Sequence, residues 1–109
     1  MIVTDEMVQT AFDVLNDSRG PAAAAAKEKR QAEAAVKATR ARLFLGYTGN
    51  VAERNAKAEC HPDMKQATDR DAEAHGLAAL FANKRSDAMA MIDAWRTESA
   101  NYRGMARVG

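Results

Sequence analysis

The sequence predicts an all-α fold, a long helical hairpin with short additional helices. Alanine occupies 25 of the 109 positions, and the alanine-rich segments are filled out with the helix formers lysine, arginine and glutamate. Leucine, isoleucine, valine and phenylalanine together supply only 16 residues, so a single copy buries little apolar area. We therefore expect one helical domain, residues 1–109, that associates into a homo-oligomer.

The first half of the hairpin is expected to contain two helices, at about 4–17 and about 21–45. Thr4 is a suitable N-cap, and Asp5 follows in the first turn, where the helix dipole favours negative charge. The stretch "NDSRGP" predicts a break between the two helices. Pro21 then suits the first position of the second helix.

The second half is expected to contain a short helix at about 50–59 and a long one at about 63–103. Asn50 is the predicted N-cap of the short helix, with Glu53 at the capping-box position. Gly76 is where the long helix is most prone to kink or break, and the sequence leaves its continuity there open.

The glycine-bracketed stretch "LFLGYTGNVAER", residues 43–54, raises the question of phosphate binding. A phosphate-binding P-loop needs a preceding strand and a G-x-x-x-x-G-K-[ST] motif, and neither is present here. The local interpretation is a turn between helices. We expect Gly46 to end the long helix in a left-handed conformation and Gly49 to lead into the next helix.

Charge is distributed unevenly along the chain, although the net charge is only +1. Residues 1–19 carry a net charge of −3 and residues 53–75 one of −2, whereas residues 27–42 carry +4 and residues 84–107 carry +2. Each long helix therefore has a basic segment. Such segments usually form only a solvated helix face, and they also occur in nucleic-acid-binding surfaces.

The basic residues around the glycine loop are the candidate nucleic-acid site. Cationic side chains next to an aromatic ring are what a non-specific single-strand binder uses, charge for the backbone and a ring for base stacking. The predicted contact residues are Lys37, Arg40, Arg42, Tyr47, Arg54 and Lys57.

A second set of candidates forms an apolar stripe along the last helix. These residues lie close to heptad spacing, which is typical of a helix–helix interface. They are expected to make the core and the subunit contacts: Leu77, Phe81, Ala88, Met91, Ile92 and Trp95.

Catalytic and metal-binding patterns are weak. "ECHPD" at 59–63 brings Cys60 and His61 together, and His75 follows, but a zinc site needs two ligand pairs at defined spacings. Neighbours in sequence such as Cys60 and His61 are poorly placed to act as nucleophile and base. We expect no catalytic residue, no metal ligand, no cofactor and no enzymatic activity.

The N-terminus and the single cysteine bear on localisation. "MIVTDEMVQT" is acidic and lacks the basic and apolar regions of a signal peptide, and no stretch is apolar enough to cross a bilayer. One cysteine, Cys60, cannot form an internal disulfide. We expect a cytoplasmic protein without membrane contact.

Two stretches carry a resemblance to a known family. "KATRARLFLGYTGN" and "LAALFANKRSDAMAMIDAWRTESANYR" resemble small helical proteins of phage and prophage early regions. More distantly, the order of parts over about residues 27–103 is similar to the T-even phage recombination mediator UvsY. The resemblance implies an oligomeric protein that binds single-stranded DNA and helps load a recombinase. It implies that Lys37, Arg40, Arg42 and the loop around Tyr47 approach the strand.

The expected function is therefore that of a phage-type recombination accessory protein that binds single-stranded DNA non-specifically. The alternative is a non-enzymatic structural or adaptor protein that makes protein–protein contacts. A third interpretation, a metal-dependent enzyme, requires Cys60, His61 and His75 to converge. The first two are distinguished by whether Lys37, Arg40 and Arg42 face solvent together or are covered by carboxylates.

Overall fold

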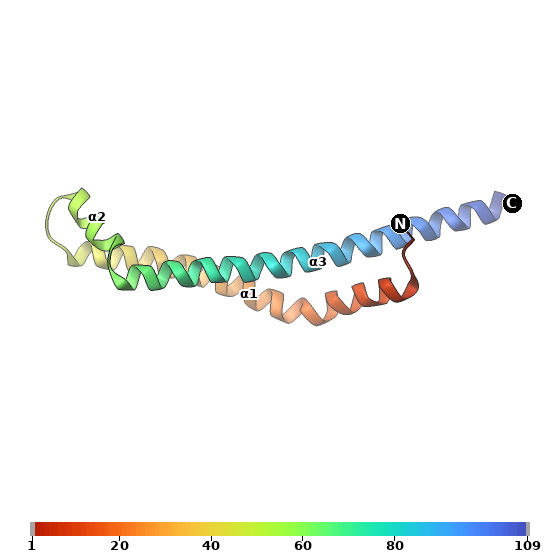
Figure 1. Ribbon diagram of the computed structural model, residues 1–109, viewed down its shortest axis with the longest axis horizontal. Coiled ribbons are helices and arrows are strands. Elements are labelled where there is room, and N and C mark those ends of the chain that lie inside the picture. The colour runs from red at the N-terminus through yellow and green to blue at the C-terminus, as the bar shows by residue number, and fades with distance from the viewer. Residues whose placement is uncertain (1, 109) are drawn as a thin grey trace. The chain divides into compact units, whose positions relative to one another are not determined.

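The computed structural model describes residues 2–108 and is all-helical, with no strand in that range. Helix α1 spans Asp5–Gly46, α2 spans Val51–Glu59 and α3 spans Pro62–Val108. The predicted all-α class and the pair of long helices are confirmed. Figure 1 shows the second half of α1 and the first half of α3 running antiparallel, with α2 at the turn that joins them.

Helix α1 is continuous where the sequence predicted a break between 17 and 21. Its start is as expected, since the backbone N–H of Met7 donates to Thr4 Oγ1 at 3.1 Å. Pro21 lies inside the helix and has no N–H to donate to the carbonyl of Asp17. Five alanines follow, and alanine has the highest helix propensity of any residue type. The helix therefore continues despite the one missing hydrogen bond.

The turn between α1 and α2 corrects the expectation for Gly46. Gly46 is the last residue of α1, and only Gly49, at φ 118°, has positive φ among the described residues. Residues other than glycine rarely adopt this φ, so the backbone conformation favours glycine at position 49. Asn50 is the N-cap of α2, as predicted, and its side chain accepts a hydrogen bond from the Glu53 N–H at 2.9 Å.

Helix α3 begins at a proline and continues through Gly76. Pro62 suits the first helical turn, where its missing N–H has no intrahelical acceptor. His61 completes this start, because the backbone N–H of Asp63 donates to His61 Nδ1 at 3.0 Å. Gly76 does not interrupt the helix, since a glycine costs only about 1 kcal/mol relative to alanine.

The contacts within the chain divide it into two compact units. Unit 1 comprises residues 1–22 and 80–109, and unit 2 comprises residues 23–79. Unit 1 has a core of Val8, Ala11, Ala88 and Ile92. Unit 2 is built differently, with a cluster around one methionine and a seam of alanines: Leu43, Ala58, Met64, Ala25, Ala32, Ala67 and Ala74.

Candidate functional site

Two of the predicted DNA-binding arginines are paired with carboxylates. Arg40 Nε lies 2.6 Å from Glu59 Oε1, and Arg42 Nη2 lies 2.8 Å from Asp63 Oδ2. Both pairs are at the surface, where such a pair contributes about 0–1 kcal/mol. The carboxylates nonetheless neutralise these arginines. This arrangement matches the adaptor alternative better than a free phosphate-binding row.

The aromatic ring of the predicted site is also engaged. Tyr47 packs against the unit 2 core, and Lys57 Nζ lies 5.9 Å from the centre of its ring. Arg54 turns toward α1, where its Nε donates to the Phe44 carbonyl at 3.0 Å and its guanidinium lies 4.0 Å from the Phe44 ring centre. The packing of Tyr47 and the nearby Lys57 leave less of the Tyr47 ring open for base stacking.

The outer side of the same end of unit 2 is both apolar and basic. Leu45 is 76% exposed and Val51 is 64% exposed. They form a shallow depression with Phe44, Lys37 and Arg40, which we call the basic tip. Large exposed apolar side chains next to cations are typical of a surface that binds an acidic apolar partner.

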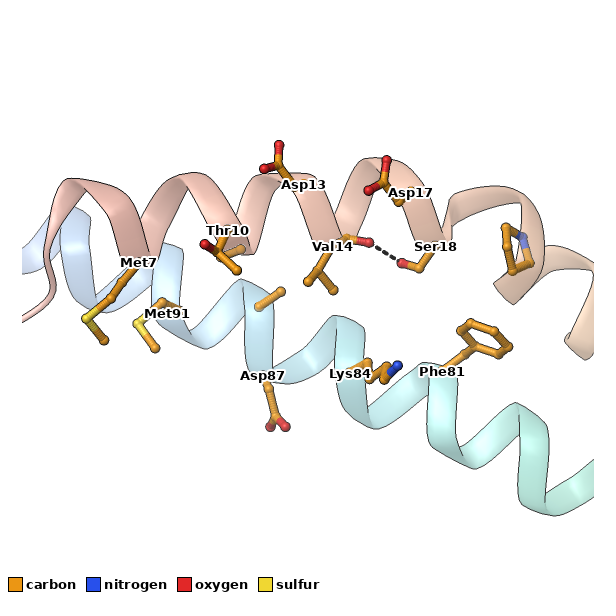
Figure 2. Close-up of a pocket in the computed structure, with 13 residues that line it drawn as sticks. Met7, Thr10, Asp13, Val14, Asp17, Ser18, Phe81, Lys84, Asp87 and Met91 are labelled. Atoms are coloured by element: carbon orange, nitrogen blue, oxygen red, sulfur yellow. Dashed lines mark hydrogen bonds between the residues drawn. The ribbon is translucent and has the colours of Figure 1, made fainter.

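Unit 1 contains an open apolar groove between α1 and α3, of about 570 Å³. Figure 2 shows Val14 on α1 pointing towards α3, with Met7 and Met91 close together at one end. Phe81 lies at the other end, on α3. The unit 1 groove is thus lined mainly by apolar side chains, contributed by both helices.

The edges of the unit 1 groove are acidic. Asp13 and Asp17 lie along α1, and Asp87 lies on the opposite edge, on α3 (Figure 2). Lys84 is the one cation among the lining residues. An apolar floor between acidic edges favours an apolar ligand that carries positive charge.

The predicted apolar stripe does not behave as one surface. Ala88 and Ile92 are buried in unit 1, whereas Phe81 and Met91 line the groove. Leu77 belongs to unit 2 and is 46% exposed, so it lies outside the core. A strict heptad places it on the stripe, but a straight α-helix with 3.6 residues per turn drifts away from a heptad face.

Trp95 and the N-terminus are joined by polar contacts that the sequence did not indicate. The Trp95 indole Nε1 donates to Asp5 Oδ1 at 3.1 Å, and the Val3 N–H donates to Glu98 Oε2 at 2.7 Å. Further along unit 1, Arg85 Nη1 donates to the Leu15 carbonyl at 2.8 Å. These bonds link the first 15 residues of the chain to α3.

Cys60 and His61 do not converge with His75. Cys60 is exposed, and His61 accepts the hydrogen bond at the start of α3 described above. Instead, His75 lies beside Glu33 of α1 and Asp71 of α3. Sequence reasoning missed this group because Glu33 is far away in the chain; the only local signal was the Asp-x-x-x-His spacing, which puts both residues on one helix face.

An interhelical ion pair strengthens unit 2 near this group. Arg70 donates to both carboxylate oxygens of Glu28, from Nε at 2.7 Å and from Nη2 at 3.1 Å. These hydrogen bonds lower the pKa of Glu28 and raise the pKa of Arg70. A two-point contact of this kind fixes the orientation of both side chains.

Comparisons with protein-family models, with curated proteins and with solved structures find no match to this chain. The resemblance to phage recombination mediators therefore stays a prediction. Between residues 2 and 108, none of the helices has a stretch apolar enough to cross a membrane.

Proposed function

We propose that this chain is a non-enzymatic helical interaction protein that assembles with further copies of itself. The observation that carries the proposal is the unit 1 groove, an open apolar surface on a chain that has few large apolar residues to bury. Contiguous exposed apolar surface marks protein–protein contact sites. The single cysteine of this chain fits a reducing compartment, and we propose a cytoplasmic location.

The proposed occupant of the groove is the basic tip of another copy. Charge supports this choice, because Asp13, Asp17 and Asp87 line the groove, whereas the residues that line the basic tip include Lys37 and no acidic residue. Shape supports it as well, since Leu45 projects into solvent and would be buried on docking. Complementary charge also steers encounter and fixes register.

The two surfaces differ, so the contact is heterologous. Each copy offers one unit 1 groove and one basic tip, and a head-to-tail contact produces rings or open filaments. The assembly would therefore grow with protein concentration and weaken with salt, because its edges are charged.

Sedimentation velocity over about 10–500 µM chain at about 50 mM and 500 mM salt tests the proposal. We expect association at low salt that Lys37→Glu weakens and that Asp17→Lys restores in the double variant. Lys27→Glu is the matched control, with the same charge change at an exposed position away from the tip. A monomer throughout the range, or equal loss in the control, would refute the proposal.

Single-stranded DNA binding with recombinase loading is a second candidate. It is favoured by the concentration of five cationic side chains between residues 37 and 57, near Tyr47. Exposed carboxylate pairs such as Arg42–Asp63 are weak enough for a phosphate to compete. Fluorescence anisotropy of a labelled oligonucleotide at about 50 and 200 mM salt tests it, because phosphate contacts make affinity fall steeply with salt. No binding at the lower salt would exclude this candidate.

A further inference from the structure

Three potential metal ligands from two helices meet within unit 2. Asp71 and His75 lie one turn apart on α3 and face Glu33 on α1. One ligand atom from each lies within 4.8 Å of the other two. The closest pair is His75 Nε2 and Glu33 Oε1, at 2.9 Å.

The hydrogen-bond partner of His75 Nδ1 determines whether the other ring nitrogen, Nε2, carries a hydrogen or a lone pair. His75 Nδ1 lies 2.8 Å from the backbone oxygen of Asp71, an atom that can only accept a hydrogen bond. Nδ1 therefore carries a hydrogen, as in most metal-binding histidines, whose other nitrogen donates to a carbonyl or carboxylate. In the neutral ring, the lone pair of Nε2 then points at the Glu33 carboxylate. That contact is repulsive unless a proton or a metal cation lies between the two atoms.

Asp71 provides an independent indication of a cation. Its Oδ1 atom is buried and has no hydrogen-bond donor. His75 Nδ1 lies 3.2 Å from this oxygen, but its N–H is already directed at the backbone oxygen of Asp71. A buried carboxylate oxygen without a partner is costly, and a bound cation would satisfy it.

We propose that Glu33, Asp71 and His75 bind a divalent transition metal of the zinc class and so tie α1 to α3 within unit 2. One imidazole and two carboxylates suit zinc and its neighbours, whereas calcium and magnesium prefer oxygen ligands alone. Tetrahedral zinc ligands lie roughly 3.3 Å apart, so the 2.9 Å between Nε2 and Oε1 has to open only slightly. The side chains are partly exposed, which leaves room for this adjustment and for a water as fourth ligand.

Isothermal titration of the untagged full chain with zinc chloride tests the site. The experiment uses a Cys60→Ser background, because the exposed Cys60 thiol would bind zinc by itself. We expect one zinc per chain and a rise in the thermal unfolding midpoint, both lost in His75→Gln. Glu33→Gln keeps the size of the side chain and should weaken binding at least tenfold. Circular dichroism confirms that each variant remains helical.

His61→Gln is the matched control, because it removes the other histidine of unit 2 and should leave zinc binding unchanged. Millimolar magnesium should not displace the zinc. No binding up to about 100 µM zinc would overturn the proposal. Equal zinc affinity in the His75→Gln variant, or equal loss in the His61→Gln variant, would also overturn it.

Discussion

The alanine seam of unit 2 leads to a prediction that depends on shape and not on hydrophobicity. Ala32 is 0% exposed, so its methyl group fills the available space between the helices. Ala32→Leu adds three carbon atoms at this point and leaves helix propensity nearly unchanged. Overpacking of this kind costs about 1–3 kcal/mol, because neighbouring side chains and the backbone have to move.

Ala34→Leu is the matched control for this substitution. Ala34 lies two residues further along α1 and is exposed, so the same added atoms meet solvent there. We expect the control to change the free energy of unfolding by less than about 0.5 kcal/mol. Only the difference between the two variants therefore reports on the seam.

Urea unfolding followed by circular dichroism at 222 nm measures the effect as a shift of the midpoint at constant slope. A loss of about 1–3 kcal/mol in Ala32→Leu, against no change in the control, is the expected result. If Ala32→Leu were as stable as the wild-type chain, or more stable, the two helices would not be in close contact at this position. The reasoning on the alanine seam would then be wrong.

Two further predictions concern the turn after α1 and an ion pair. Gly49→Ala should destabilise the chain by about 1–2 kcal/mol because of its positive φ, whereas Gly46→Ala should be neutral or stabilising; urea midpoints distinguish the two. Arg70→Ala should raise the pKa of Glu28 towards its ordinary value, as followed by carbon-detected NMR titration. Because the folded-state pKa is lowered, the wild-type pair stabilises the fold above the unfolded-state pKa of Glu28, and this contribution is lost as the pH falls through the lowered value. An unchanged pKa in the variant would contradict the assigned cause.

Much of the local structure could be predicted from the sequence. The helical class follows from alanine, lysine, arginine and glutamate content, and the N-caps at Thr4 and Asn50 follow from their side-chain chemistry. These features depend on residues within one or two turns of each other. Propensity and capping act over that distance, so a linear pattern contains the information.

Other features depended on contacts between distant residues. The sequence left open whether Arg40 and Arg42 face solvent or are covered by carboxylates, and the carboxylates that pair with them lie on α2 and at the start of α3.

The groove and the group around His75 were likewise decided by tertiary structure. Each takes its residues from both long helices, and no local pattern specifies which turn of α1 faces which turn of α3. Helix formation is a local equilibrium, whereas the pairing of two helix faces is set by how side chains far apart in the sequence pack together. For this reason the sequence alone determined a helical, alanine-rich chain, and only the tertiary structure decided where its apolar, acidic and metal-ligating side chains meet.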